Sequence, residues 1–371
     1  MDLLFTPEQE QLREMTRAFF EEVSNERAVR AAMESEQGFD EGVWQRIGAE
    51  LGLTGLGIPE QYGGADCGAV ELGVVMEEAG RALLCAPYLS TMLLAVPALL
   101  AAGDDAANRD LLPRIAAGEL RATLAWVEAS GDWTADAISL PARASGGGWT
   151  LTGEKSFVID GHTAELLLVL ARTEQGLSLF AVEADAPGLT RTPLETLDMT
   201  RKLARLDFDA TPARLVGEQG AGDAILAAVE HSAISGLAAE QVGGAQRALD
   251  MAVEYAKDRV QFGRPIGSFQ AIKHTCADML LRVECARSAA YYTMWTLAED
   301  HPEAAMATHV AKAYCSDAYF DVATESIHIH GGIGFTWEHP GHLYFRRAKS
   351  SQLLFGDATF HRERVAQALE V

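Results

Sequence analysis

Two short stretches of the sequence carry the side chains that a dinucleotide needs. Residues 259–270 read RVQFGRPIGSFQ, and residues 329–335 read IHGGIGF. An arginine can pair with a pyrophosphate, an aromatic ring can contact adenine, and clustered glycines let the backbone approach a ligand closely. Both stretches interrupt otherwise long helical patterns. Together they predict a dinucleotide site at the ends of helices.

These stretches closely resemble the FAD-binding signatures of the acyl-CoA dehydrogenases. The resemblance implies FAD as the cofactor, with Arg259 on the pyrophosphate and Phe262 near the adenine. As an isolated match, Arg259 could be a surface cation and Phe262 a core residue, but the later glycine turn favours the cofactor interpretation. The cofactor-binding residues that the resemblance implies are Arg259, Gln261, Phe262, Ile266, Phe269, Gln270, His328, Gly331 and Gly332.

His328 stands where this family usually has glutamine. An imidazole can still donate or accept one hydrogen bond, so contact with the ADP half remains expected. His328 and His330 could also suggest a metal site, but the turn glycines explain the segment better, and we expect no metal. In the family, this signature reaches across a subunit interface to FAD held mainly by the neighbouring subunit. A dimer or larger assembly is therefore expected.

The pattern of the chain divides it into three parts. Residues 1–120 read as helices, residues 121–218 as short β-type runs between Gly, Pro and Asp turns, and residues 219–371 as long helices. The last part contains four helical segments, approximately 222–258, 269–299, 302–328 and 346–370. We predict a mainly α fold with a β insert: an N-terminal helical domain, a middle β domain and a C-terminal four-helix bundle carrying the FAD signature. The acyl-CoA dehydrogenases have the same order of domains.

Two local signals refine the helical part. Thr6 is placed to cap a helix, with Pro7 in its first turn and Gln9 completing a capping box. Residues 82–103 carry no charge and are long enough to span a bilayer. Their prolines and their alanine-rich content favour a buried helix pair. We expect no membrane-spanning segment.

The amino-acid composition limits the binding partners and the cellular compartment that can be expected for this protein. Thirty Lys and Arg against 53 Asp and Glu leave a net charge of -23, which repels nucleic acid and acidic membranes. An anionic CoA thioester would need a local basic patch. The five cysteines are an odd number without a Cys-x-x-Cys pair, and the first residues lack the cationic start of a signal peptide. We expect a cytoplasmic protein.

The catalytic base of the family is missing from both of its known positions. Family chemistry removes the α proton of an acyl-CoA with a glutamate while the β hydrogen leaves as hydride to the flavin. One family position precedes a glycine at the start of the last helix, where residues 352–357 read QLLFGD and place Phe355. The other lies on the first bundle helix, at Ala233. Neither side chain can take a proton, so we predict no catalytic residue in this chain.

Three carboxylates could substitute for the base. Glu240 lies about 10 Å along the helix axis from Ala233, whereas Glu230 is separated from it by only about 4.5 Å of rise. Asp357 follows the lost base closely but has a shorter side chain. Glu230 is the better candidate, although each is more typical of a solvated or capping carboxylate.

Two hydroxyl groups that face the flavin or substrate in the family are also absent. Val127 stands at a threonine position and Ile159 at a threonine or serine position. The loss of base and hydroxyls, with the ADP signature kept, resembles the base-lacking subunits of bacterial heteromeric acyl-CoA dehydrogenases for bulky or steroid side-chain CoA esters. The resemblance implies three partners: a homologous subunit with the base, as α2β2, an acyl-CoA substrate, and electron-transfer flavoprotein or a similar acceptor. A self-sufficient enzyme using Glu230 and a non-enzymatic scaffold are the alternatives.

Overall fold

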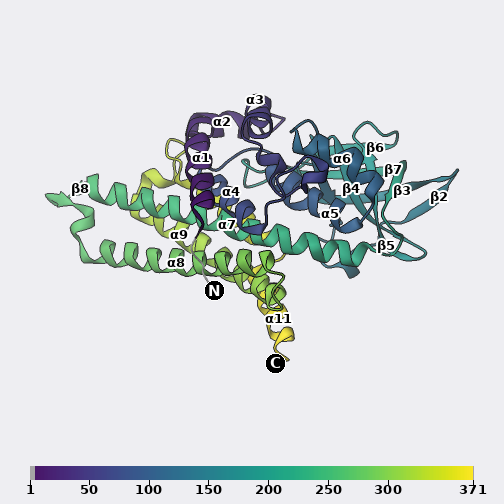
Figure 1. Ribbon diagram of the computed structural model, residues 1–371. Coiled ribbons are helices and arrows are strands. Elements are labelled where there is room, and N and C mark those ends of the chain that lie inside the picture. The colour runs from purple at the N-terminus through teal and green to yellow at the C-terminus, as the bar shows by residue number, and fades with distance from the viewer. Residues whose placement is uncertain (1–4, 371) are drawn as a thin grey trace. The chain divides into compact units, whose positions relative to one another are not determined.

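The computed structural model describes residues 5–370 and consists of two compact units (Figure 1). The first unit contains residues 1–31, 69–84 and 234–371, and the second contains residues 32–68 and 85–233. Residues 222–233 of the long helix α7, Gly222–Asp258, belong to the second unit, and residues 234–258 belong to the first. The predicted fold class, mainly helical with a β insert, is confirmed.

Helices make up the first unit. They are α1 (Pro7–Val23), the start of α2 (Glu26–Glu34), α4 (Ala69–Arg81), most of α7, α8 (Gln270–Ala298), α9 (Ala304–His330), the 3-10 segment η7 (Gly331–Phe335), α10 (Gly341–Leu353) and α11 (Ala358–Ala368). Buried small residues such as Ala238, Ala290 and Ala311 let α7, α8 and α9 pack closely. The predicted capping box is present: the Thr6 hydroxyl accepts from the Gln9 amide at 3.2 Å, and the Gln9 side chain accepts from the Thr6 amide at 2.9 Å.

The prediction of one helix over residues 346–370 is wrong. The segment forms two helices, because the chain turns between Leu353 and Ala358. Phe355 and Gly356 have positive φ angles of 61° and 99°, which no helix accommodates. Asp357 then caps α11, since its carboxylate accepts from the Phe360 amide at 2.8 Å. Gly356 and Asp357 are the local signals for this break.

A seven-stranded sheet forms the β part of the second unit. Its strands are β1 (Ala122–Ala125), β2 (Ala142–Ser145), β3 (Gly148–Ile159), β4 (Leu166–Thr173), β5 (Gly176–Glu183), β6 (Leu189–Pro193) and β7 (Leu203–Val216). The order is β1-β4-β5-β7-β3-β2, with β6 also paired to β7, and only β1 and β4 run parallel. The buried side chains of Leu167, Phe180 and Leu206 belong to the hydrophobic core of the sheet.

Short helices complete the second unit. They are α3 (Glu41–Gln45), η1 (Arg46–Glu50), η2 (Leu53–Gly55), η3 (Glu60–Tyr62), η4 (Leu89–Ala95), α5 (Val96–Ala102), α6 (Asp105–Ala116) and η5 (Ala135–Ala137). The uncharged stretch 82–103 is buried as expected, but η4 continues directly into α5 and the two form one helical run rather than a pair. Within residues 5–370, no helix combines the length and apolarity needed to cross a membrane.

Candidate functional site

The first predicted cofactor stretch forms a hairpin at the tip of α7 and α8 (Figure 1). The strands β8 (Val260–Gln261) and β9 (Arg264–Pro265) pair with each other, and η6 (Ile266–Ser268) leads into α8. Phe262 and Gly263 form the turn with φ angles of 51° and 78°. A phenylalanine in this region costs about 1–2 kcal/mol, so the turn holds Phe262 in a strained conformation.

The hairpin presents its functional side chains to solvent. Phe262 is 91% exposed, and its ring meets the edge of Phe269 at 6.0 Å between centroids. The Arg264 guanidinium lies 4.1 Å from the centroid of Phe269. Arg259, Gln261 and Gln270 are exposed, and Ile266 and Phe269 are half-buried. Phe262 is therefore not a core residue, and an isolated ring this exposed favours contact with a ligand or partner.

The second stretch forms the turn after α9. Gly331 has a φ of 65°, and a side chain built on Gly331 or Gly332 would meet no atom within 4 Å, so the backbone there is open to a ligand. His328 is exposed, with its Nδ1 3.5 Å from the Glu325 carboxylate, whereas His330 is buried. The two histidines thus lie in different surroundings.

One ring contact links the end of α7, just before the first stretch, to the second stretch. The Tyr255 ring lies 4.6 Å from that of His330, and the Tyr255 carbonyl accepts a hydrogen bond from the Arg259 amide at 2.8 Å. The hairpin and the glycine turn therefore belong to the same part of the first unit. An exposed arginine, an exposed ring and open glycine backbone fit an adenosine diphosphate group.

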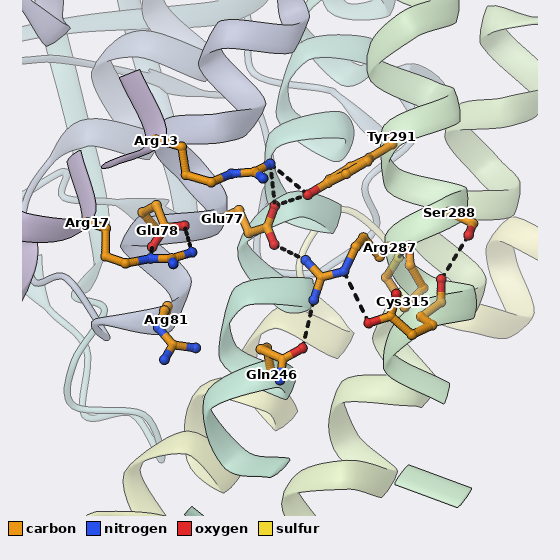
Figure 2. A network of polar contacts seen from close by, with 12 residues as sticks. Arg13, Arg17, Glu77, Glu78, Arg81, Gln246, Arg287, Ser288, Tyr291 and Cys315 are labelled. Carbon is orange, nitrogen blue, oxygen red and sulfur yellow. Dashed lines mark hydrogen bonds and ion pairs between the residues drawn. The ribbon is translucent and has the colours of Figure 1, made fainter. Parts of the chain in front are cut away.

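A partly buried polar network joins α7 and α8 (Figure 2). Arg287 of α8 donates to the Gln246 side chain of α7 at 2.7 Å and pairs with Glu77 of α4. The Tyr291 hydroxyl donates to Glu77 at 2.7 Å and accepts from Arg13 of α1 at 2.8 Å. Four helices are therefore tied together by charge-assisted bonds.

The network surrounds a polar cavity of about 290 Å³. Its lining residues are Arg17, Glu77, Glu78, Arg81, Gly243, Gln246, Asp250 and Arg287. The lining carboxylates have cationic partners: Glu77 pairs with Arg287, Glu78 with Arg17, and Asp250 with Arg81. Burial, reinforced by Glu77, raises the pKa of the Tyr291 phenol, which stays protonated. The cluster is charge-balanced, which is typical of a structural role.

Both family positions for the base are apolar and buried. Ala233 is 1% exposed and Phe355 is 4% exposed. The turn that carries Phe355 is nevertheless firmly held. The buried Lys312 ammonium donates to the carbonyls of Ser351 and Gly356 at 3.1 and 3.0 Å, and His361 Nε2 donates to the Phe355 carbonyl at 2.9 Å. None of these bonds uses the side chain of residue 355.

Lys312 was not predicted from the sequence. Its signal is a single cation inside the largely apolar face of α9, which also contains Thr308, Ala311 and Cys315. A lysine in such a place must find acceptors nearby, because an unpaired buried ammonium is costly. Those acceptors come from the turn between α10 and α11, which only the tertiary structure brings close.

The substitute carboxylates differ in availability. The buried Glu240 carboxylate accepts from Arg347 of α10 at 2.9 Å, so it serves as a counter-ion. Asp357 caps α11, as described above. Glu230 is half-buried on α7, one turn from Ala233.

The two missing flavin-facing hydroxyls leave apolar, buried side chains in the second unit. Val127 and Ile159 are 2% and 3% exposed. In the loop after Val127, Ser130 accepts from the Asp132 amide at 3.3 Å, and the Thr134 hydroxyl donates to Asp132 at 2.8 Å. The polar groups of this loop are thus bonded to one another.

A buried ion pair anchors the same loop. Glu128 accepts from Lys155 Nζ at 2.9 Å and from the Leu140 amide at 2.8 Å. Burial opposes ionisation, but bonds from Ser139 and Lys155 lower the pKa of Glu128 to about 2. Burial lowers the pKa of Lys155 to about 8. The pair accounts for Glu128 as a structural residue.

Comparison with known proteins places this geometry in a family. Residues 6–119, 125–211 and 220–370 match the N-terminal, middle and C-terminal domains of acyl-CoA dehydrogenase. The chain is 36% identical over 349 residues to acyl-CoA dehydrogenase IpdE2 of Mycolicibacterium smegmatis, covering 94% of each protein.

Solved structures agree. The Tcur3481-Tcur3483 steroid ACAD variant superposes with a TM-score of 0.88 at 34% identity and 98% coverage of both chains. The ChsE4-ChsE5 complex from Mycobacterium tuberculosis superposes with a TM-score of 0.91 at 29% identity, covering 100% of this chain and 99% of the other. The matched domains, the shared fold and the identity over almost the full length lead to one conclusion: this chain is a member of the acyl-CoA dehydrogenase family.

Proposed function

We propose that this chain is the subunit without the base in a FAD-dependent enzyme that introduces an α,β double bond into an acyl-CoA thioester. The observation that carries the proposal is Phe355, a buried phenyl ring at the family's base position on a firmly held turn. Ala233 leaves the second base position equally inert. When bound, FAD supplies the hydride acceptor of the reaction.

The residues of this chain that would hold FAD lie on its ADP half. Arg259 would pair with the pyrophosphate, Phe262 would contact the adenine, and the backbone at Gly331 and Gly332 would approach the ligand. His328, exposed beside the turn, would donate or accept one further hydrogen bond. The flavin ring itself would be held by the partner, whose pocket would keep the hydroxyls that Val127 and Ile159 lack here.

The proposed partner is a homologous subunit with the base, in an α2β2 complex. The exposed rings of Phe262, Phe335 and Trp337 give this chain an apolar surface that suits such a contact. One related structure, named for a steroid ACAD, supports a bulky, steroid-type CoA ester as substrate, and another, named for a two-component complex, supports a heteromeric assembly. We further propose a cytoplasmic location and electron-transfer flavoprotein or a similar protein as acceptor.

FAD is expected to raise the melting temperature of the mixed complex clearly and that of this chain alone hardly at all. A ligand that binds only the assembled state stabilises it by about 2.7 kcal/mol at a hundredfold excess over its dissociation constant. Thermal melts of the chain alone and with its partner, each with and without FAD, measure this. Equal shifts in both samples, with one flavin per isolated chain, would instead support a self-sufficient enzyme using Glu230.

Arg259→Ala is expected to weaken FAD binding to the complex by roughly ten- to a hundredfold without unfolding the chain. The change removes one charge-assisted phosphate contact worth about 1.5–3 kcal/mol. Fluorescence titration of FAD into the apo complex measures the affinity. Arg282→Ala, which removes a partly exposed arginine of α8, is the control and leaves the affinity unchanged. Equal FAD affinities for the two variants would show that Arg259 does not contact the cofactor.

A further inference from the structure

Three histidines close the loop that contains the glycine turn. His330 is the last residue of α9, and His339 and His342 flank the start of α10. The ring centroids of His330 and His339 are 4.2 Å apart, and the His330 ring also lies against Tyr255 of α7. His342 meets the edge of Trp337 at 4.5 Å. The rings therefore bridge the two ends of the loop 331–340.

Hydrogen bonds determine where the protons lie on two of these rings. His330 Nδ1 is 2.6 Å from the Ser326 carbonyl, which can only accept, so this nitrogen carries a proton. His339 Nδ1 accepts from the Gly341 amide at 3.0 Å, so this nitrogen carries none. Gly341 is the first residue of α10. Proton uptake at His339 Nδ1 would therefore remove the acceptor that holds the start of this helix.

The third ring, that of His342, is buried. His342 is 7% exposed, and among residues 5–370 nothing hydrogen-bonds its Nε2. It lies in the first turn of α10, where the helix amides disfavour a positive charge. Burial, together with Arg346, Arg30 and the His339 ring, lowers the pKa of His342 to about 4. His342 is therefore neutral at physiological pH.

The charges around the cluster also favour neutral rings. Glu26 and Arg30 of α2 act on both His339 and His342, Arg346 of α10 acts on His342, and Tyr255 of α7 contacts His330 without a charge. Only Glu26 would stabilise an imidazolium, and it already pairs with Arg30 at 2.8 Å. Burial lowers the pKa of His330 and of His339 as well.

We propose that His330, His339 and His342, in their neutral forms, are positioning residues that hold the loop 331–340 in the shape needed to contact the ADP half of FAD. The loop begins with two glycines whose surroundings are open, and its 3-10 turn over residues 331–335 is local, so it does not fix the distance between the two ends of the loop. The ring contacts and the bond to Gly341 supply that constraint. The role toward FAD rests on the proposed function, whereas the constraint on the loop does not.

Acid should release the loop. Two imidazolium rings at the spacing of His330 and His339 would repel each other, and protonated His339 would lose its bond to Gly341. Because the folded-state pKa values lie below the ordinary value, the constraint is complete above pH about 6.5 and is lost as the pH falls further.

Hydrogen exchange tests the constraint in the isolated chain without cofactor. Protection factors for the amides of residues 331–341 are expected to fall by about tenfold or more between pH about 7.5 and about 5. His339→Asn keeps an acceptor but cannot titrate, so its protection should stay high at both pH values. His339→Leu removes the acceptor and should lower the protection at both. His274→Asn, an exposed histidine on α8, is the control and should behave as wild type.

Measuring FAD binding to the assembled complex distinguishes the constraint on the loop from the role of the loop in binding FAD. The wild-type affinity should fall by about tenfold over the same pH range, and His339→Asn should resist the fall. If wild type and His339→Asn show the same protection at both pH values, the histidines do not position the loop. If the loop is released and the FAD affinity stays constant, the positioning role toward FAD is overturned and so is the assignment of ADP to this turn.

Discussion

Removing the base from the partner subunit is expected to lower the turnover of the assembled complex by about a hundred- to ten-thousandfold, whereas Glu230→Gln in this chain leaves it within a few fold. A general base typically contributes that much to the rate of a proton abstraction. Both family positions for a base in this chain hold buried apolar side chains, Ala233 and Phe355. The measurement is the steady-state turnover of the purified complex with an acyl-CoA and an artificial electron acceptor.

Asp357→Asn is the matched control within this chain. Asparagine caps helices about as well as aspartate, so α11 should keep its start while the carboxylate is lost. Its turnover should stay near that of wild type. A hundredfold loss in Glu230→Gln, with FAD still bound, would place the base in this chain and would overturn the proposal of a base-lacking subunit.

Glu240→Leu is expected to destabilise the chain by about 3–5 kcal/mol, because it leaves Arg347 buried without its counter-ion. The side chains of Glu240 and Arg347 are only 4% and 3% exposed, so water cannot solvate the arginine charge once the carboxylate is removed. The double variant Glu240→Leu with Arg347→Leu should recover most of the loss, since no charge then remains buried. Urea unfolding of the isolated chain measures the free energy of unfolding of wild type, the single variant and the double variant.

Glu254→Ala is the control for this experiment. Its carboxylate is 66% exposed and lies 3.8 Å from Arg247, so its loss should change the stability by less than about 1 kcal/mol. If Glu240→Leu were as mild as this control, or if the double variant were no more stable than the single one, the ion pair would not be the reason that Glu240 is buried.

Features set by neighbouring residues were predictable. The capping box of Thr6 and Gln9 lies within a single turn, so its residues identify it without a tertiary structure. The β-type runs between residues 121 and 218 are short and end at turn residues, and they form strands of one sheet. The break at Gly356 and Asp357 was equally local, but the helical periodicity on either side of it concealed the turn.

Contacts between distant residues were not predictable. From the sequence, Glu240 was a carboxylate that could substitute for the base. In the structure it pairs with Arg347 on another helix. Lys312 has its acceptors in a turn that follows α10, and His330 meets His339 only because the loop between them closes. Such pairs depend on how helices pack, and the spacing of residues along the chain does not encode that packing directly.

By itself, the sequence determined which chemical groups this protein has: an arginine, an aromatic ring and a glycine turn typical of a dinucleotide site, and no carboxylate at either family position for the base. These conclusions depend only on the identity of residues at known spacings. The tertiary structure decided how those groups are used. It exposed Phe262, assigned Glu240 and Asp357 to structural roles, and joined His330 to His339, because burial and pairing are properties of the packed chain and determine whether a polar group is available for chemistry.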